Sequence, residues 1–466
     1  MPTPEEWRNK LLKRLDDRAT RIRNYVRYSE GKHDSRYITR EFREAFGSLF
    51  SGYAENFCPL VVDAVEERLA VVGFRLGRDL SADSDANRIW QENLLDAESQ
   101  LCHGEALIKS EASVIVSPYR SEWPKNDTPL ITIEDPLQVY VELNPSNRRK
   151  RLAAIKKWID DDGHLRATLY LPGAIYKWRS EQKDSDFSLP SWPDYTTITW
   201  KQRQETGDES WPLRNPLETV PVIPFVNRPR LDRSGRSEFE EVMPIQDAVN
   251  QVIRDMLLIA EIAGFPQRYG INIEPEVDES TGQPVERYKA SIKRMWLAPP
   301  PENGEPESKF GQFPAADLTP LIKMVEQRIQ HIATITRTPP HYLLGQSGTF
   351  PSGESLKATE TGLVAKVKEK QRYFGESWEE VMRLAFAALG DTRQGVTDSE
   401  VIWSDPESRT EAEHVDALLK MKSLGVPDEA LWERYGATPQ EIARWKVMGA
   451  SSETADVVEP VETPVA

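Results

Sequence analysis

The loop sequence Gly345-Gln-Ser-Gly-Thr-Phe-Pro-Ser-Gly-Glu354 lies between two long segments of helical periodicity, and these segments decide the fold. The first begins at Asp317, where Thr319-Pro320 is a common helix start. The second continues to Leu389, and the glycine that follows is a typical helix stop. Apolar residues three or four positions apart predict one packed face on each helix. They are Leu318, Leu321, Ile322, Val325, Ile329 and Ile332 in the first segment, and Leu356, Leu363, Val367, Phe374, Trp378, Val381 and Ala385 in the second.

Glycine residues predict a mobile loop and a bent second helix. With three glycines and one proline, the loop cannot pack against itself and is expected to move. Gly362 and Gly375 lie inside the second helical segment, where each costs about 1 kcal/mol relative to alanine. We therefore expect this long helix to bend at both positions.

Another long helix is predicted upstream of the segment that begins at Asp317. Ser237-Glu-Phe-Glu240 matches a capping box, and an apolar face continues from there to Ala263. Pro244 is expected to kink the first turns. Many prolines between residues 265 and 316 exclude a long helix in that part of the chain. Two helices that bracket a compact, non-helical insertion predict a stalk with a small head.

The rest of the chain is predicted to mix helices with antiparallel strands, which makes the fold class α+β. The strands are expected to be antiparallel because their links are too short for helical crossovers. Asp160-Asp-Asp-Gly163 is interpreted as a hairpin turn, since it lacks the ligand spacing of a calcium loop. Helices are expected at 4–28, 41–55, 60–72, 85–100, 410–424, 428–435 and 438–448, and strands at 114–116, 130–133, 139–141, 155–159, 168–171, 196–200, 294–297 and 401–403.

Composition narrows the function classes. The 466 residues carry 59 Lys and Arg against 75 Asp and Glu, a net charge of −16, which does not indicate a general nucleic-acid-binding surface. The arginines of the first helix are therefore expected to pair with acidic neighbours: Arg14, Arg18, Arg21 and Arg23. Cys58 and Cys102 are expected to be buried reduced thiols. We expect neither a signal peptide nor a membrane span, because the sequence has no long apolar run.

Signatures of catalysis, cofactors and metals are missing from the sequence. Gly104-Glu-Ala-Leu-Ile-Lys-Ser110 lacks the second glycine of a phosphate-binding loop. The six histidines do not occur in a zinc-binding spacing, and no serine nucleophile elbow is present. With 75 Asp and Glu residues, some carboxylates will be adjacent by chance, so residue types alone do not exclude a two-metal nuclease. We predict that the protein is not an enzyme and uses no cofactor and no metal.

Four groups of residues resemble those of the portal proteins of tailed bacteriophages, in particular long-tailed phages of actinobacterial hosts. The resemblance covers most of the chain. None of the groups is a catalytic signature, but their combination in this order is specific. The groups are Tyr28-Ser-Glu-Gly-Lys-His33; Phe42-Arg-Glu-Ala-Phe-Gly47 leading to Phe57-Cys-Pro-Leu-Val-Val-Asp63; Pro244-Ile-Gln-Asp-Ala-Val249 through Phe265-Pro-Gln267; and Pro339-Pro-His-Tyr-Leu-Leu-Gly345 through Gly353-Glu-Ser-Leu356.

The resemblance implies a homo-oligomeric ring, expected to be a dodecamer, at one vertex of the capsid. Double-stranded DNA would pass through this ring during packaging and ejection. Mapped onto this chain, the family's parts would be a wing at 1–235, a stem helix at 236–264, a clip at 265–316, a second stem helix at 317–338, a tunnel loop at 339–354, a long kinked helix returning to the wing at 355–404, a crown at 405–448 and a disordered acidic tail at 449–466.

The resemblance also implies partners and site residues. The terminase large subunit, head completion or adaptor proteins, and the major capsid and scaffold proteins would bind the ring, which would be a virion component assembled in the host cytoplasm without a membrane. An acidic or neutral channel would keep DNA from sticking, because few fixed cations would hold its phosphates. We expect the channel residues to be Gln346, Ser347, Gly348, Thr349, Phe350 and Gly353. Lys366, Lys370 and Arg372 are expected to pair with acidic groups of a neighbouring subunit.

Two other functions stay open from the sequence. One is a head-to-tail adaptor or minor capsid protein, although adaptors are usually shorter and lack paired long helices. The other is a metal-dependent nuclease of the packaging machinery, which magnesium-dependent cleavage of duplex DNA would reveal.

Overall fold

The structure is a computed structural model with a mixed α+β fold and antiparallel sheets. Its residues form two compact units. The first contains 1–34, 54–246 and 329–466, and the second contains 35–53 and 247–328. The structure describes residues 2–33, 54–77, 82–117, 128–183, 194–204, 209–231, 235–264, 268–271, 309–312, 316–344, 353–407 and 411–455.

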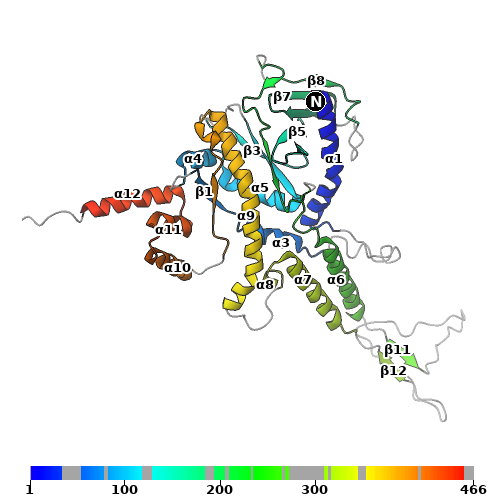
Figure 1. Ribbon diagram of the computed structural model, residues 1–466. Helices are drawn as coiled ribbons and strands as arrows, with labels where there is room; N and C mark the ends of the chain where they lie inside the picture. Colours follow the sequence, from blue (N-terminus) through cyan, green and yellow to red (C-terminus); the bar gives the residue numbers. More distant parts are fainter. Residues whose placement is uncertain are drawn as a thin grey trace, which may run out of the picture. The chain divides into compact units, whose positions relative to one another are not determined.

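A six-stranded antiparallel sheet packs against the amino-terminal helix α1 (Pro4–Ser29) in the first unit (Figure 1). The strand order is β4-β5-β6-β7-β8, and β9 also pairs with β7. Leu11 and Leu12 of α1 are fully buried in one cluster with Ile155 and Leu165 of the sheet. The strands are β4 (Val139–Leu143), β5 (Arg151–Ile159), β6 (His164–Tyr170), β7 (Ala174–Lys183), β8 (Trp200–Gln202) and β9 (Leu213–Arg214).

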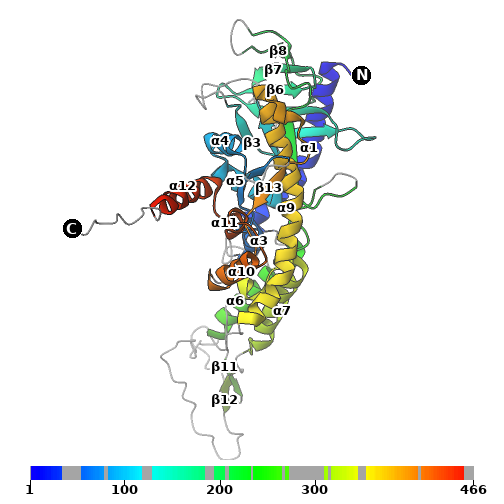
Figure 2. The same ribbon diagram turned by 60° about the vertical axis from the view of Figure 1, so that its left-hand side comes forward.

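A three-stranded antiparallel sheet, β10-β2-β3, packs against two helices, α5 (Leu95–Lys109) and α9 (Gly353–Leu389). Helix α9 is one continuous helix of 37 residues, the yellow-to-orange ribbon of Figure 2. Phe374 and Trp378 of α9 are fully buried. The strands of this sheet are β2 (Glu111–Val116), β3 (Ile131–Glu134) and β10 (Val222–Val226).

The chain that follows α9 returns to the amino-terminal half of the first unit. Strand β13 (Glu400–Trp403) pairs antiparallel with β1 (Val71–Arg75), so segments far apart in sequence share one ladder. Beyond β13, three helices end the described chain, and Leu431 and Ile442 are among their buried residues. The remaining elements of the first unit are α3 (Cys58–Glu66), α4 (Ser84–Glu92), α8 (Pro340–Leu343), η2 (Thr392–Gly395), α10 (Glu411–Ser423), α11 (Asp428–Tyr435) and α12 (Pro439–Ala455).

The second unit is entered and left through two helices. Most of α6 (Met243–Gly264) and the first part of α7 (Thr319–Thr336) belong to it. Between them, β11 (Arg268–Ile271) pairs antiparallel with β12 (Lys309–Gln312). The predicted strand at 294–297 lies outside the described residues, and so does the predicted helix at 41–55 except for residues 54 and 55, which are not helical.

Several sequence predictions are confirmed. The sheets are antiparallel, and β5 and β6 are joined by the predicted turn at 160–163. Asp160 accepts a hydrogen bond from the backbone N–H of His164 at 2.8 Å, which closes this turn. Arg14 pairs with Glu142 and Arg18 with Glu111, as expected of a basic helix in an acidic chain. Cys58 and Cys102 are buried free thiols.

Two predicted helices near the amino terminus are wrong in extent. The helix expected at 60–72 ends at Glu66, because Val71 begins β1 and pairs with Trp403 of β13. The single helix expected at 85–100 is divided into α4 and α5 at Leu94, whose φ is 55°. The Asn93 side chain holds this break, since its oxygen accepts from the backbone N–H of Ile131 at 2.8 Å. Tertiary hydrogen bonds override helical periodicity here.

The capping box predicted at Ser237 is also wrong. Helix α6 begins at Met243, and Pro244 occupies its first turn, where a proline fits without a kink. The Ser237 hydroxyl donates instead to the Leu107 carbonyl at 3.4 Å. Glu238 is buried and bonds to two lysines of α9. Residues 237–240, which the sequence assigned to a helix start, therefore bond to other elements across the core.

Three smaller differences complete the comparison. The strand expected at 196–200 is mostly turn, because Asp194 accepts hydrogen bonds from the backbone N–H groups of Thr196 and Thr197, both at 3.0 Å. Helix α12 continues to Ala455, whereas we expected it to end at Met448. At Gly375, an added Cβ would lie 3.4 Å from Nε1 of Trp403, so this glycine admits the close approach of β13 to a continuous α9.

Candidate functional site

The two chain segments that flank the glycine-rich loop form the candidate functional site. The predicted channel residues Gln346, Ser347, Gly348, Thr349 and Phe350 lie outside the described residues. Gly353 is the first residue of α9, and α8 ends at Leu343 on the other side of the loop. The structure therefore shows how both ends of the loop are held.

A polar network ties α8 to the first turns of α9. The Tyr342 hydroxyl donates to Oε1 of Glu360 at 2.9 Å and accepts from the Arg68 guanidinium at 2.8 Å. Arg68 lies directly beyond α3 and also approaches Glu360 at 3.9 Å. Partial burial raises the pKa of Tyr342, so its hydroxyl stays protonated and can keep donating. One side chain thus bridges the two flanks of the loop.

An ion pair and a close backbone approach position the beginning of α9. Lys357 forms an ion pair with Glu413 of α10. At Gly362, the position of an added Cβ would be 3.6 Å from Cβ of Arg337, which follows α7. Helix α9 therefore meets both the segment before the loop and the helices after β13 within its first three turns.

Farther along α9, two lysines share one buried carboxylate. Nζ of Lys366 lies 2.7 Å from Oε2 of Glu238, and Nζ of Lys370 lies 2.8 Å from Oε1. The Glu238 side chain is 1% exposed, so this is a core ion cluster. Burial by itself would raise the pKa of Glu238, but the two ammonium groups outweigh it and lower the pKa to about 2.

The sequence analysis missed this intramolecular partner. We expected Lys366 and Lys370 to meet acidic groups of a neighbouring subunit, yet both reach Glu238 of the same chain. Glu238 lies more than a hundred residues before them, and no local spacing links the three. Arg372 is exposed, so its pairing with a neighbouring subunit stays a prediction.

An aromatic cluster fastens the second half of α9 to the rest of the first unit. Nε1 of Trp378 donates to Nε2 of His103 at 2.8 Å, and the His103 ring stacks on Phe374 with a centroid distance of 5.3 Å. Trp378 also contacts Phe225 of β10 and Trp90 of α4. Burial lowers the pKa of His103 to about 3, so its imidazole is neutral and can accept this hydrogen bond.

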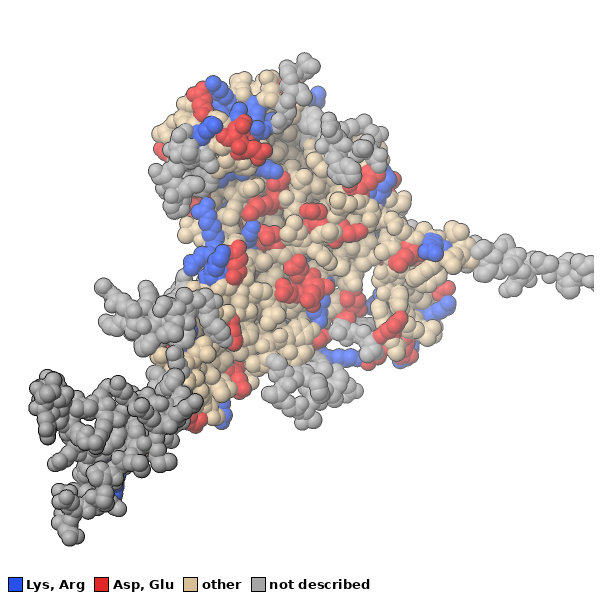
Figure 3. Space-filling model, turned by 180° about the vertical axis from the view of Figure 1, so that it is seen from behind, with Lys and Arg blue, Asp and Glu red and all other residues tan. Residues whose placement is uncertain are grey.

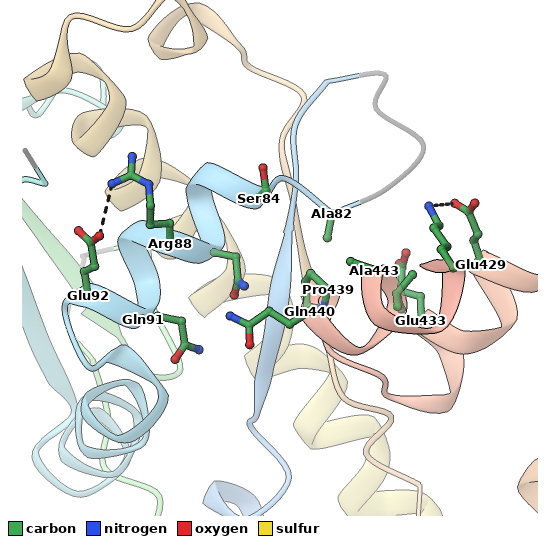
Figure 4. Close-up of a pocket in the computed structure, with 13 residues that line it drawn as sticks. Ala82, Ser84, Arg88, Gln91, Glu92, Glu429, Glu433, Pro439, Gln440 and Ala443 are labelled. Atoms are coloured by element: carbon green, nitrogen blue, oxygen red, sulfur yellow. Dashed lines mark hydrogen bonds and ion pairs between the residues drawn. The ribbon is translucent and has the colours of Figure 1, made fainter. Parts of the chain in front are cut away.

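A surface groove of about 410 Å³ lies between α4 and the last two helices (Figure 4). Ser84, Arg88 and Gln91 line one wall, and Pro439 and Gln440 line the other. The charged groups at its rim already have partners within the chain, such as Arg88 with Glu92 and Lys446 with Glu429. The groove therefore presents a mixed surface without a concentrated charge.

In the described parts of the chain, no group of three or more His, Cys, Asp or Glu residues is arranged to hold a metal ion. Within the same residues, no helix is both long enough and apolar enough to cross a membrane. Acidic and basic side chains are interspersed on the face shown in Figure 3.

Comparison with known proteins gave consistent matches over nearly the whole chain. The family model described as phage portal protein, SPP1 Gp6-like, matches residues 8–454. The portal protein of Mycobacterium phage D29 is 30% identical over 464 residues, which cover 95% of this chain and 88% of that protein. The portal protein of Mycobacterium phage L5 is 30% identical over 459 residues, covering 95% and 85% respectively. A chain of a native gene transfer agent virion aligns with a TM-score of 0.41 at 13% identity, covering 86% of this chain and 90% of that chain.

Proposed function

The chain belongs to the SPP1 Gp6-like family of phage portal proteins, and from this premise we propose that its glycine-rich loop lines the channel for double-stranded DNA. A phage portal protein is a structural component of the virion and a ring-forming oligomer of the capsid. We propose a dodecameric ring with no catalytic activity of its own. The match of the family model to residues 8–454 is the observation that carries this function.

The parts of the portal are assigned by proposal to the ranges named from the sequence. The wing would comprise residues 1–235, the clip residues 265–316 and the crown residues 405–448, with stem helices on either side of the clip. In the assembled portal, the clip would bind the terminase large subunit during packaging and head completion proteins afterwards. Major capsid and scaffold proteins would surround the ring during its assembly in the host cytoplasm.

The acidic net charge and the paired lysines support the proposal that DNA slides through the channel. The net charge of the chain is −16, and the lysines nearest the loop flank are paired with carboxylates: Lys357 with Glu413 and Lys366 with Glu238. Each fixed cation on a phosphate would release counterions and add affinity, which would slow translocation. A polar loop carrying Gln346, Ser347 and Thr349 would touch the backbone of DNA weakly.

Electron microscopy of the purified protein tests the assembly. We expect rings of about twelve subunits with a central hole in class averages. The same preparation, incubated with Mg²⁺ and linear duplex DNA, should leave the DNA intact. Persistent monomers under all assembly conditions would contradict the ring, and magnesium-dependent cleavage would contradict the absence of catalysis.

Bulky substitutions test the loop. We expect Gly348→Val and Gly353→Val to leave ring assembly unchanged and to reduce the amount of DNA packaged in phage complementation, because branched side chains would stiffen and narrow the loop. Gly395→Val is the matched control, since nothing lies within 4 Å of an added Cβ at that glycine. Normal packaging by both loop variants would remove the loop from the mechanism.

A further inference from the structure

Lys366 is the point at which three elements of the first unit meet. From helix α9, its ammonium group contacts Oε2 of Glu238 at 2.7 Å and the Thr336 carbonyl at 3.0 Å. Glu238 precedes α6 by a few residues, and Thr336 is the last residue of α7. Lys366 is only 7% exposed. A single buried cation thus contacts both the last residue of α7 and the segment that precedes α6.

The two lysines of this cluster have different roles. The cluster holds two ammonium groups and one carboxylate, so one positive charge is left over. Both lysines reach the carboxylate of Glu238, but Lys370 has no bond to α7. Lys366 also faces the carboxyl end of α7, where the helix dipole concentrates negative charge and the last carbonyls lack helical partners. The leftover charge is therefore placed where a helix end compensates it.

Other bonds hold the carboxylate in place. Nδ2 of Asn227 donates to Oε1 of Glu238 at 3.0 Å, and the Glu238 backbone N–H donates to the Leu107 carbonyl at 2.9 Å. The Thr336 hydroxyl donates to the Ile332 carbonyl at 2.7 Å, within the last turn of α7. Glu238 and Thr336 are thus each held by further bonds, and Lys366 bonds to both.

We propose that Lys366 is an ionic joint that sets the position of α9 against the end of α7 and the segment before α6. A displacement of either changes the contacts of Lys366 and so shifts the first half of α9, which begins directly after the glycine-rich loop. The joint acts within one subunit, so it operates whether or not the loop touches DNA. Lys370, in contrast, pairs with Glu238 without reaching α7.

Hydrogen–deuterium exchange of the purified full-length protein tests the joint. Lys366→Met keeps the length of the side chain and removes its charge. We expect exchange to rise about tenfold in two separate regions, residues 329–338 at the end of α7 and residues 357–366 in α9, because a hydrogen bond to a charged group is lost in a buried site. Lys370→Met should leave residues 329–338 at the wild-type rate and accelerate exchange only near residue 238.

Lys368→Met is the matched control on the same helix. Lys368 is 46% exposed and pairs with Glu407 at the surface, so its loss should change exchange in neither region. Equal acceleration of residues 329–338 in the Lys366 and Lys370 variants would overturn the joint, because it would indicate general loosening of the core. Unchanged exchange in Lys366→Met would overturn it as well.

A charge-balanced variant covers the case in which Lys366→Met does not fold. Glu238→Gln combined with Lys370→Met removes one negative and one positive charge, so the net charge of the cluster is kept. Lys366 can still bond to the Thr336 carbonyl and to the oxygen of the new amide. We expect residues 329–338 to remain protected as in the wild type, and rapid exchange there would refute the role of Lys366.

Discussion

Helices α9 and α10 differ in how deeply their apolar residues are buried, although both were predicted from the sequence. Phe374, Trp378 and Val381 of α9 are fully buried between strands and helices of the first unit. Helix α10 contains no buried residue, and its Leu419 is 60% exposed. Burial of one large apolar side chain is worth about 1.5–3 kcal/mol, so α9 anchors the unit while α10 contributes little to its stability.

The two helices are also held in place by different kinds of interaction. Helix α9 is held by aromatic packing and by a buried ion cluster, whereas α10 is attached to it through surface ion pairs such as that of Lys357 with Glu413. Exposed ion pairs are worth about 0–1 kcal/mol and weaken with salt. Helix α10 is therefore held weakly, and its Leu419 stays exposed.

The largest effect is expected from Trp378→Ala in α9. Removing this fully buried ring leaves a cavity between Phe225 and Trp90 and deprives His103 of its donor. We expect a loss of about 3–5 kcal/mol in the free energy of unfolding, measured by chemical denaturation. Trp432→Ala in α11 is the matched control, since that ring is only partly buried. A larger loss in the control would reverse the assignment of α9 as the anchor.

The next largest loss in the free energy of unfolding is expected from Glu238→Gln. The variant leaves two buried ammonium groups without a carboxylate, and breaking a buried ion pair costs about 3–5 kcal/mol. The pKa of Glu238 is lowered from 4.5 to about 2, so the wild type gains stability from this group above pH 4.5 and loses it as the pH falls towards 2. Thermal unfolding of both proteins across this range should show their difference shrinking towards low pH. A constant difference would contradict the buried charge.

A pH effect of intermediate size is expected from His103. Its pKa is lowered from 6.5 to about 3, so between these values the unfolded chain binds a proton that the folded chain does not. Stability therefore falls as the pH drops below 6.5, by about 2 kcal/mol at pH 5. His103→Gln keeps an acceptor for Trp378 and should flatten this dependence in urea titrations. Parallel curves for the two proteins would show that His103 does not carry the effect.

The smallest effect is expected from Leu419→Ser in α10. Because this side chain is 60% exposed, we expect the free energy of unfolding to change by less than about 0.5 kcal/mol. Differential scanning calorimetry of the unassembled chain measures it directly. A loss comparable to that of Trp378→Ala would remove the contrast between the two helices.

The sequence predicted elements better than it predicted their partners. Apolar spacing placed α1 and α9 close to their observed bounds, and turn residues placed the hairpin at 160–163. It failed where a tertiary bond competes with local preference, as at Asn93, whose side chain stabilises a helix break, and at Ser237, which bonds across the core. The channel residues of the loop stay a proposal, whereas the network of Tyr342 that holds its flanks came only from the structure.

By itself, the amino-acid sequence determined the α+β class, the long helix after the loop and the resemblance to portal proteins. These follow from the spacing of apolar residues, from glycine and proline at element ends, and from short motifs in a fixed order, all of which are local properties. Only the tertiary structure decided that Lys366 and Lys370 meet Glu238, and that Trp378 meets His103, which is 275 positions away in the chain. A buried charge or polar ring must find a partner wherever packing brings one, and sequence spacing does not encode that encounter.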